Sequence, residues 1–136
     1  MTIELPARHE HLTFMTPLAQ SRADRLVRFI AQASPATILD IGCGWAELLM
    51  QAVAAVPKAH GVGVDLDAGA IAHGRRLARE RGLDERVDLV EADARNAGPP
   101  LVDAVICIGA SQVWGSPVEE TSPSATSGRF LPCARA

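Results

Sequence analysis

The sequence predicts an α/β fold built on a parallel sheet, with helices packed against both faces. Two observations predict this class. Short apolar runs of strand length alternate with segments whose apolar residues recur at helical spacing. Three of the four apolar runs finish on or next to an acidic residue, and the first is followed by a glycine turn. Strands that alternate with helices in this way form parallel sheets through right-handed crossovers.

The composition limits the classes of function. The chain has 136 residues, of which 48% are hydrophobic, and this is enough for one ordinary domain. Its formal net charge of -3 argues against a nucleic-acid backbone or an anionic membrane as the main partner, because both favour a basic face. No segment reaches the roughly eighteen apolar residues of a membrane span, and the first residues lack a signal-peptide core. We therefore expect a cytoplasmic protein without a membrane partner.

Metal binding is not expected from the cysteines or the histidines. Cys43, Cys107 and Cys133 have no C-x-x-C spacing and are expected to be reduced packing residues. His9 and His11 form an H-x-H pair in the lead-in, residues 1–17. This pair is either a metal-binding arm or part of a mobile, exposed terminus, and the lack of a third ligand favours the second interpretation.

The sequence predicts a helix ahead of the central strand–turn–helix motif. Residues 18–33 follow helical spacing, and Pro35 ends the helix because the residue before a proline is disfavoured in helical geometry. The following segment, ATILDIGCGWAELLM, predicts a buried strand, a turn on Gly42 and Gly44, and a second helix. Glycines admit a ligand close to the backbone, and the start of a helix directs free N–H groups toward it. Trp45 is expected either to line this pocket or to cover the sheet.

Two further strands are expected over residues 60–67 and 87–93, and a fourth over residues 101–109. Gly61 and Gly63 leave room for close helix packing. A helix over residues 68–81 separates the second and third strands, and we expect Asp67 to cap its start.

Three acidic residues are expected at one edge of this sheet. Asp40, Asp65 and Asp93 lie at or just beyond the ends of the first three strands, and ligands of parallel sheets bind at that edge. Asp40 either reaches the ligand or caps the glycine turn. Asp65 is either a loop acid or an acceptor of two ribose hydroxyls, and Asp93 either caps the turn into Ala94 and Arg95 or accepts an adenine amino group. The pattern favours a nucleoside cofactor, with its amino-acid part at the glycine turn.

At these residues a family resemblance is clear. The segments ILDIGCGWAELL, GVGVDLD, VEADAR and DAVICIGA, in this order and spacing, resemble the first half of a class I S-adenosylmethionine-dependent methyltransferase. The likeness covers about residues 37–114. It implies a Rossmann-like sheet of seven strands, S-adenosyl-L-methionine as the cofactor, and transfer of its methyl group to a small-molecule N, O, S or C nucleophile.

The resemblance also implies roles for residues of the methionine end of the site. By motif, Asp40, Gly42 and Gly44 would surround the methionine portion of the cofactor. The backbone of Ile108 and Gly109 would face its amino group. Residues 14–18, FMTPL, resemble a lead-in that folds over the cofactor, and Glu10 and His11 are the nearest candidates if the reaction needs a base. No other catalytic residue can be assigned.

At the nucleoside end, Asp65 would take the ribose hydroxyls and Leu66 would lie against the adenine. Asp93 and Ala94 would meet the adenine edge.

The chain departs from the family pattern after Trp114. We expect a partial cofactor-binding domain at residues 18–114, with about four of the family's seven strands, and a disordered tail at residues 115–136. This pattern predicts a truncated product with weak cofactor binding and little turnover alone. Its fourth strand would leave an apolar edge through which the chain can associate with itself.

Two other classes remain open. An NAD(P)-dependent oxidoreductase-type domain explains Gly42, Gly44 and Asp65, but it needs a third glycine near Ala46 and leaves Asp93 without a role. The second class is a non-catalytic half-domain that binds a partner through the open sheet edge.

Overall fold

A computed structural model of the chain describes residues 12–15, 18–96 and 101–108. In chain order the elements are α1 (Gln20–Gln32), β1 (Thr37–Ile41), α2 (Glu47–Ala55), β2 (His60–Asp65), α3 (Ala68–Glu80), β3 (Val87–Glu91) and β4 (Ala104–Ile106). The predicted segments 1–11 and 115–136, with His9, Glu10, His11 and Gly109, lie outside the described residues.

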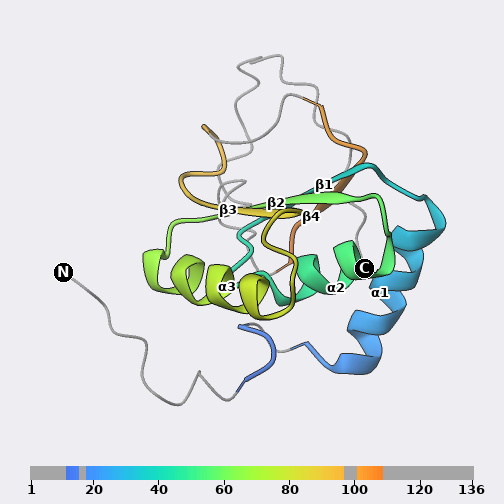
Figure 1. Ribbon diagram of the computed structural model, residues 1–136, viewed down its shortest axis with the longest axis horizontal. Coiled ribbons are helices and arrows are strands. Elements are labelled where there is room, and N and C mark those ends of the chain that lie inside the picture. Colours follow the sequence, from blue (N-terminus) through green and yellow to red (C-terminus); the bar gives the residue numbers. More distant parts are fainter. Residues whose placement is uncertain (1–11, 16–17, 97–100, 109–136) are drawn as a thin grey trace, which may run out of the picture.

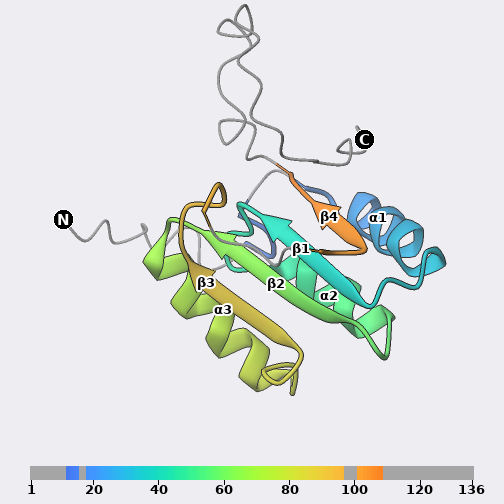
Figure 2. The same cartoon turned by 90° about the horizontal axis from the view of Figure 1, so that it is seen from above.

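The four strands form one parallel sheet in the order β3-β2-β1-β4 (Figure 2). The chain moves outward from β1 through β2 to β3, and then returns to place β4 on the other side of β1. The direction of winding therefore reverses between β1 and β4. In open parallel sheets, this reversal leaves a crevice at the carboxyl ends of the two strands. The predicted parallel α/β class is confirmed.

The three helices lie on one side of the sheet (Figure 1). The larger apolar core is between the helices and the sheet and includes Ile38, Leu49, Val53, Ile71 and Leu89. A smaller cluster centred on Leu39, Ile41 and Val64 belongs to the same sheet but not to this core. Within the described residues, the helical layer covers one face of the sheet, so no described helix corresponds to the layer expected on the other face.

Glycines set the distance between the helical layer and the sheet. A Cβ atom on Gly61 would lie 2.8 Å from Leu49 Cδ1, and one on Gly63 would lie 2.7 Å from Leu89 Cδ2. The predicted room for a helix is confirmed at Gly61, which α2 packs against, whereas the room at Gly63 is filled by Leu89 of β3 and Cys43 of the turn. Gly74 of α3 is closer still, because its Cβ would lie 2.5 Å from the carbonyl oxygen of Trp45.

The strands are shorter than predicted. β4 covers only Ala104–Ile106, whereas residues 101–109 were expected, and Leu101 is 88% exposed. Asp103, the residue before β4, bonds to the backbone at the start of β1 and so sets where β4 begins. Its Oδ2 accepts hydrogen bonds from the backbone N–H groups of Ala36 and Thr37, at 2.9 and 3.0 Å. The side chain of Asp103 thus holds the start of β4 beside the start of β1.

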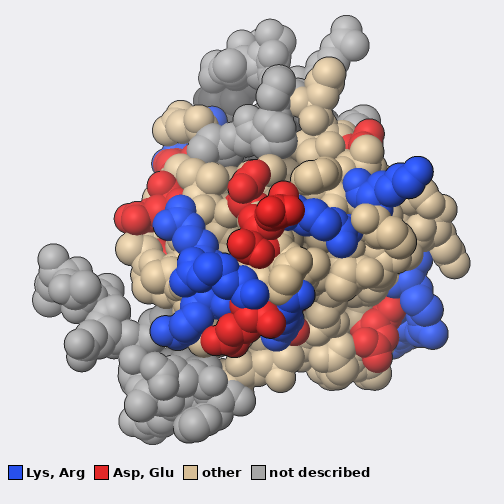
Figure 3. Space-filling model, viewed as in Figure 1, with Lys and Arg blue, Asp and Glu red and all other residues tan. Residues whose placement is uncertain are grey.

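Charges of both signs are intermixed on the surface. The face shown in Figure 3 carries lysine and arginine side chains interspersed with aspartate and glutamate, without a continuous basic surface. None of the described helices has both the length and the apolar character needed to cross a membrane.

Candidate functional site

The turn after β1 is fastened to the end of β2. The backbone N–H groups of Gly42 and Cys43 donate to the carbonyl oxygen of Val64, at 2.8 and 3.1 Å. Gly42 and Gly44 have φ angles of 67° and 58°, in the left-handed region that favours glycine. The turn therefore needs glycine at both positions, and it holds the beginning of α2 at the reversal point of the sheet.

Asp40 is buried beside this turn. It is 4% exposed and lines a cavity of about 50 Å³ with Gly42, Gly44 and Trp45. Burial, and then the negative charge of Asp65, raise the pKa of Asp40 to about 8. Among the described residues, no group donates a hydrogen bond to its carboxyl group. A buried polar group without a partner is rare in proteins and fits a ligand that carries a hydrogen-bond donor.

Asp65 ends β2 directly across the turn. Its Oδ2 accepts from the backbone N–H of Gly44 at 2.8 Å, and its Oδ1 accepts from that of Asp67 at 2.9 Å. An ionised carboxylate has about four acceptor positions, so about two remain for a ligand. The side chain is half-buried and therefore reachable. The predicted pair of hydroxyl contacts is compatible with this geometry.

Leu66 and Asp67, which follow Asp65, differ in their surroundings. Leu66 is 72% exposed at the rim of the site, where its apolar side chain is available to a flat ring. Asp67 caps α3, because its Oδ1 accepts from the N–H of Ala70 at 3.0 Å. The predicted capping role of Asp67 is confirmed.

Asp93 is paired with a neighbouring arginine. Its carboxylate accepts from Nε and Nη2 of Arg95, and Oδ1 also accepts from the backbone N–H of Arg95 at 2.9 Å. These hydrogen bonds lower the pKa of Asp93 to about 2. Asp93 therefore caps the turn into Ala94 and Arg95, which is one of the two roles expected for it. The contacts of Asp93 and Ala94 with an adenine remain a prediction.

The far wall of the cavity comes from β4 and from the lead-in. Ile106 and Ile108 line it on one side, and Phe14 and Met15 on the other. The indole Nε1 of Trp45 donates to the carbonyl oxygen of Thr13 at 2.9 Å, and Phe14 is only 7% exposed. Trp45 therefore lines the cavity, as one of the two expectations had it, together with Phe14 and Met15 of the lead-in.

Sequence reasoning did not identify Glu47, the first residue of α2. It is 7% exposed, lines the same cavity and accepts two hydrogen bonds from Arg81, at 3.0 and 2.8 Å. It also accepts from Gln51 at 2.9 Å. The available signal was its position in the first turn of α2, because the positive end of the helix dipole stabilises a carboxylate there.

Cys43 behaves as a packing residue. Its thiol donates to the carbonyl oxygen of Gly44 at 3.3 Å and lies against Gly63. Burial, followed by the charges of Asp40 and Asp65, raises the pKa of the thiol. A thiol that holds its proton is a poor nucleophile and a poor metal ligand. Within the described residues, no three His, Cys, Asp or Glu side chains are grouped to hold a metal ion.

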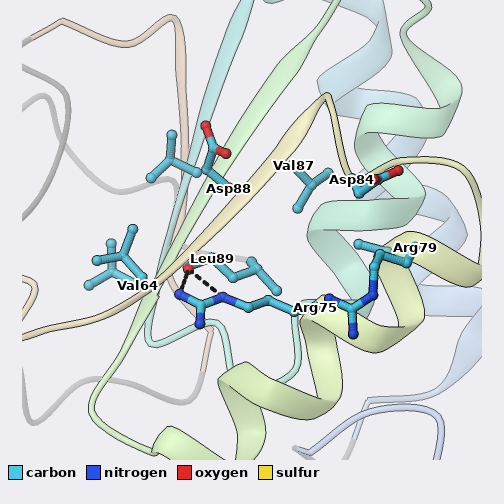
Figure 4. A pocket seen from close by; sticks show the side chains of 10 residues that line it. Val64, Arg75, Arg79, Asp84, Val87, Asp88 and Leu89 are labelled. Carbon is cyan, nitrogen blue, oxygen red and sulfur yellow. Dashed lines mark hydrogen bonds between the residues drawn. The ribbon is translucent and has the colours of Figure 1, made fainter.

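A larger, open hollow of about 650 Å³ lies along the outer edge of β3 (Figure 4). Arg75 crosses it, and its Nε and Nη2 donate to the carbonyl oxygen of Leu89 at 3.1 and 2.7 Å. This arginine satisfies a carbonyl at the sheet edge, which discourages pairing with another strand. The hollow is lined along β3 from Val87 to Val90 and does not include Asp40 or the glycine turn.

Comparison with known proteins agrees with this geometry. A sequence model of a family described as a methyltransferase domain matches residues 38–122. The X-ray structure of YjhP from E. coli is similar, with 25% identity and a TM-score of 0.70, over 81% of this chain and 45% of that one. A SAM-dependent methyltransferase from Thiobacillus denitrificans, solved with S-adenosyl-L-homocysteine, has 23% identity and a TM-score of 0.71, over 84% of this chain and 48% of that one.

A structure described as an RNA methyltransferase from Salinibacter ruber, also with S-adenosyl-L-homocysteine, has a TM-score of 0.61 at 22% identity, over 68% of this chain and 60% of that one. The chain spans less than half the length of the first two proteins.

Proposed function

Since the chain belongs to the class I S-adenosylmethionine-dependent methyltransferases, we propose that it binds S-adenosyl-L-methionine over the glycine turn after β1 and takes part in methyl transfer to a small-molecule nucleophile. The single observation that supports the site best is Asp40. A carboxyl group that is 4% exposed, without a donor among the described residues, faces the same cavity as the turn.

Asp40 and Asp65 would hold neighbouring portions of the cofactor. Asp40 and the turn residues Gly42 and Gly44 would receive the methionine portion, with the backbone of Ile108 and Gly109 toward its amino group. The remaining acceptor positions of Asp65 would take the ribose hydroxyls. Such an arrangement fits an elongated ligand that lies across the ends of β1 and β2.

The adenine would be held by residues that follow β2 and β3. The exposed side chain of Leu66 would cover one face of the ring, while Asp93 and Ala94 would lie at its edge. Because Asp93 already binds Arg95, the contact of Asp93 with adenine would use an acceptor position that Arg95 leaves open.

The cofactor supplies a methyl group that its sulfonium already activates. The protein's part is therefore to orient the reacting groups and to exclude water, and orientation alone can account for about 7–11 kcal/mol of barrier lowering. Phe14, Ile106 and Ile108 make the cavity wall apolar next to the turn. These side chains would keep water from the reacting centre.

A small molecule is the proposed methyl acceptor. The formal net charge of -3 disfavours a nucleic-acid backbone as the acceptor, because such partners favour a basic protein. The described residues supply the cofactor side of the cavity, so we expect turnover by the chain alone to be slight and cofactor binding to be the more direct test.

The test measures binding of S-adenosyl-L-homocysteine by isothermal titration calorimetry, with NADH as the competing class of ligand. Asp65→Ala should weaken S-adenosyl-L-homocysteine binding about thirtyfold, because charge-assisted hydrogen bonds worth about 2 kcal/mol are lost. Asp67→Asn is the matched control, since Asp67 caps α3 and its amide can still accept from Ala70.

The outcomes separate the two nucleotide classes. Binding of S-adenosyl-L-homocysteine that depends on Asp65 supports the proposal. Preferential binding of NADH would instead support the oxidoreductase interpretation, although Glu47 stands where its third glycine is expected. An Asp65→Ala variant that folds and keeps full affinity would place the ribose elsewhere.

A further inference from the structure

A short piece of the lead-in covers the glycine turn. This segment, residues 12–15, is called the strap below. Trp45, next to the turn, donates from Nε1 to the carbonyl oxygen of Thr13 at 2.9 Å, and Phe14 is buried against the core. The strap is thus held both by a hydrogen bond and by an apolar side chain, although it belongs to neither a helix nor a strand.

Met15 is the strap residue that meets the turn. A Cβ atom on Gly44 would lie 2.6 Å from Met15 Sδ and 3.2 Å from both Cβ and Cγ of the same side chain. The methionine side chain therefore lies directly on the surface that the missing Cβ of Gly44 leaves open. That surface is the one over which the methionine portion of the cofactor is proposed to lie.

The space that remains is too small for a cofactor. The cavity bounded by Met15, Gly44 and Asp40 is about 50 Å³. Small-molecule sites are usually about 300–1,000 Å³. The side chain of Met15 and the amino-acid portion of a cofactor cannot occupy this place together.

We propose that Met15 takes the place of the cofactor's methionine portion and that the cofactor enters by displacing the strap, which Trp45 holds closed. The proposal rests on the proposed cofactor site. Met15 suits this role because its unbranched thioether side chain adapts to irregular space and repacks easily. Its CH₂–CH₂–S chain is also the chemical group that the methionine portion of the cofactor would bring to the same surface.

The expected effect follows from the population of open straps. If only a fraction of molecules has the strap displaced, the apparent dissociation constant equals the intrinsic constant divided by that fraction. Removing the side chain of Met15 makes the surface of Gly44 accessible in all molecules. The association rate for S-adenosyl-L-homocysteine should then rise about tenfold, with a smaller change in the dissociation rate.

The experiment compares association rates of S-adenosyl-L-homocysteine with the full chain by surface plasmon resonance, which does not depend on the tryptophan that one variant removes. Met15→Ala is the test variant. Met15→Leu keeps the volume without the sulfur and should bind within about twofold of the natural rate, since volume-conserving apolar exchanges are tolerated. Leu12→Ala removes a side chain of the same strap that is 51% exposed, and it should leave the rate unchanged. Trp45→Phe removes the hydrogen bond to Thr13 and should also raise the association rate.

The results distinguish the strap from the site itself. Faster association in Met15→Ala and Trp45→Phe, or binding by Met15→Ala when the natural chain binds too slowly to detect, supports the strap proposal. Equal association rates in the natural chain and Met15→Ala overturn it while the cofactor site stands. Absence of binding to both the natural chain and Met15→Ala contradicts the proposed function and, with it, the strap.

Discussion

The raised pKa of Asp40 makes the free energy of unfolding of the whole chain depend on pH. Its pKa is raised from 3.8 to about 8, by burial first and by Asp65 second. Between these two values the unfolded chain has lost this proton while the folded chain keeps it. Folding therefore takes up a proton in this range, and the free energy of unfolding falls as the pH rises.

We predict that Asp40→Asn removes this pH dependence. The contribution of Asp40 to the slope is about −1.4 kcal/mol per pH unit between pH 5 and pH 7, and the neutral asparagine has no such contribution. The variant should be more stable than the natural chain at pH 8, and the advantage should disappear near pH 4. Urea denaturation at a series of pH values measures it.

The matched control is Asp88→Asn on β3, whose side chain is exposed. It should leave the slope unchanged. The low pKa of Asp93, about 2, acts in the opposite sense and only below pH 4, where stability is lost as that carboxylate is protonated. A natural chain whose stability is level from pH 5 to pH 7 would contradict the assigned state of Asp40.

Individual residues were predictable where their chemistry depends on local sequence. The glycine turn, the capping role of Asp67 and the position of Asp65 follow from neighbouring residues. The partners of Glu47, Asp103 and Arg86 were not predictable, because they are distant along the chain. Arg86, for example, donates to the carbonyl oxygens of Val53, Val56 and Ala59, at 2.7, 2.7 and 3.1 Å, and so holds the end of α2.

At the level of elements, the close contact of α3 with the glycine turn is the most demanding packing feature. We predict that Gly74→Ala destabilises the chain by about 1–3 kcal/mol, because the new methyl group would overlap the Trp45 carbonyl oxygen and Leu89. This loss outweighs the gain of about 1 kcal/mol that alanine normally brings to a helix. The free energy of unfolding in urea gives the measurement.

Gly69→Ala in the same helix is the control. Gly69 is exposed, and its nearest contact would be Asp67 Oδ1 at 3.3 Å, so this variant should be neutral or slightly more stable. Equal stability of the two variants would mean that α3 can shift away from the turn at little cost.

Element types were predicted well, and element lengths less well. The apolar periodicity identified every helix and strand that the structure describes, but it extended the fourth strand to residues 101–109 instead of Ala104–Ile106. Apolar residues such as Leu101 continue beyond the strand, so composition alone does not show where pairing begins. The hydrogen bonds of Asp103 to β1 set that point.

For the whole molecule, the two outer strands of the described sheet differ in protection (Figure 2). Arg75 covers the Leu89 carbonyl on the β3 edge, whereas no described strand pairs with the outer edge of β4. Val105 of β4 is 41% exposed. An unpaired edge with apolar side chains favours association between chains.

We predict concentration-dependent self-association that Val105→Lys reduces by at least fivefold, measured by sedimentation velocity. A lysine at a sheet edge opposes pairing with a second strand. Val90→Lys provides the control, since Val90 is 39% exposed on β3, whose edge Arg75 protects. A chain that stays monomeric at every concentration would refute an association surface on β4.

The place of β1 in the sheet also governs how the nascent chain matures. β1 has β2 on one side and β4 on the other, and the hydrogen bonds that Asp103 makes to Ala36 and Thr37 span 67 and 66 residues. At a synthesis rate of about 5–20 residues per second, the ribosome needs about 3–13 seconds to supply this second neighbour. During that interval the central strand has one open flank, which makes the growing polypeptide a natural client for chaperones that shield unpaired strands.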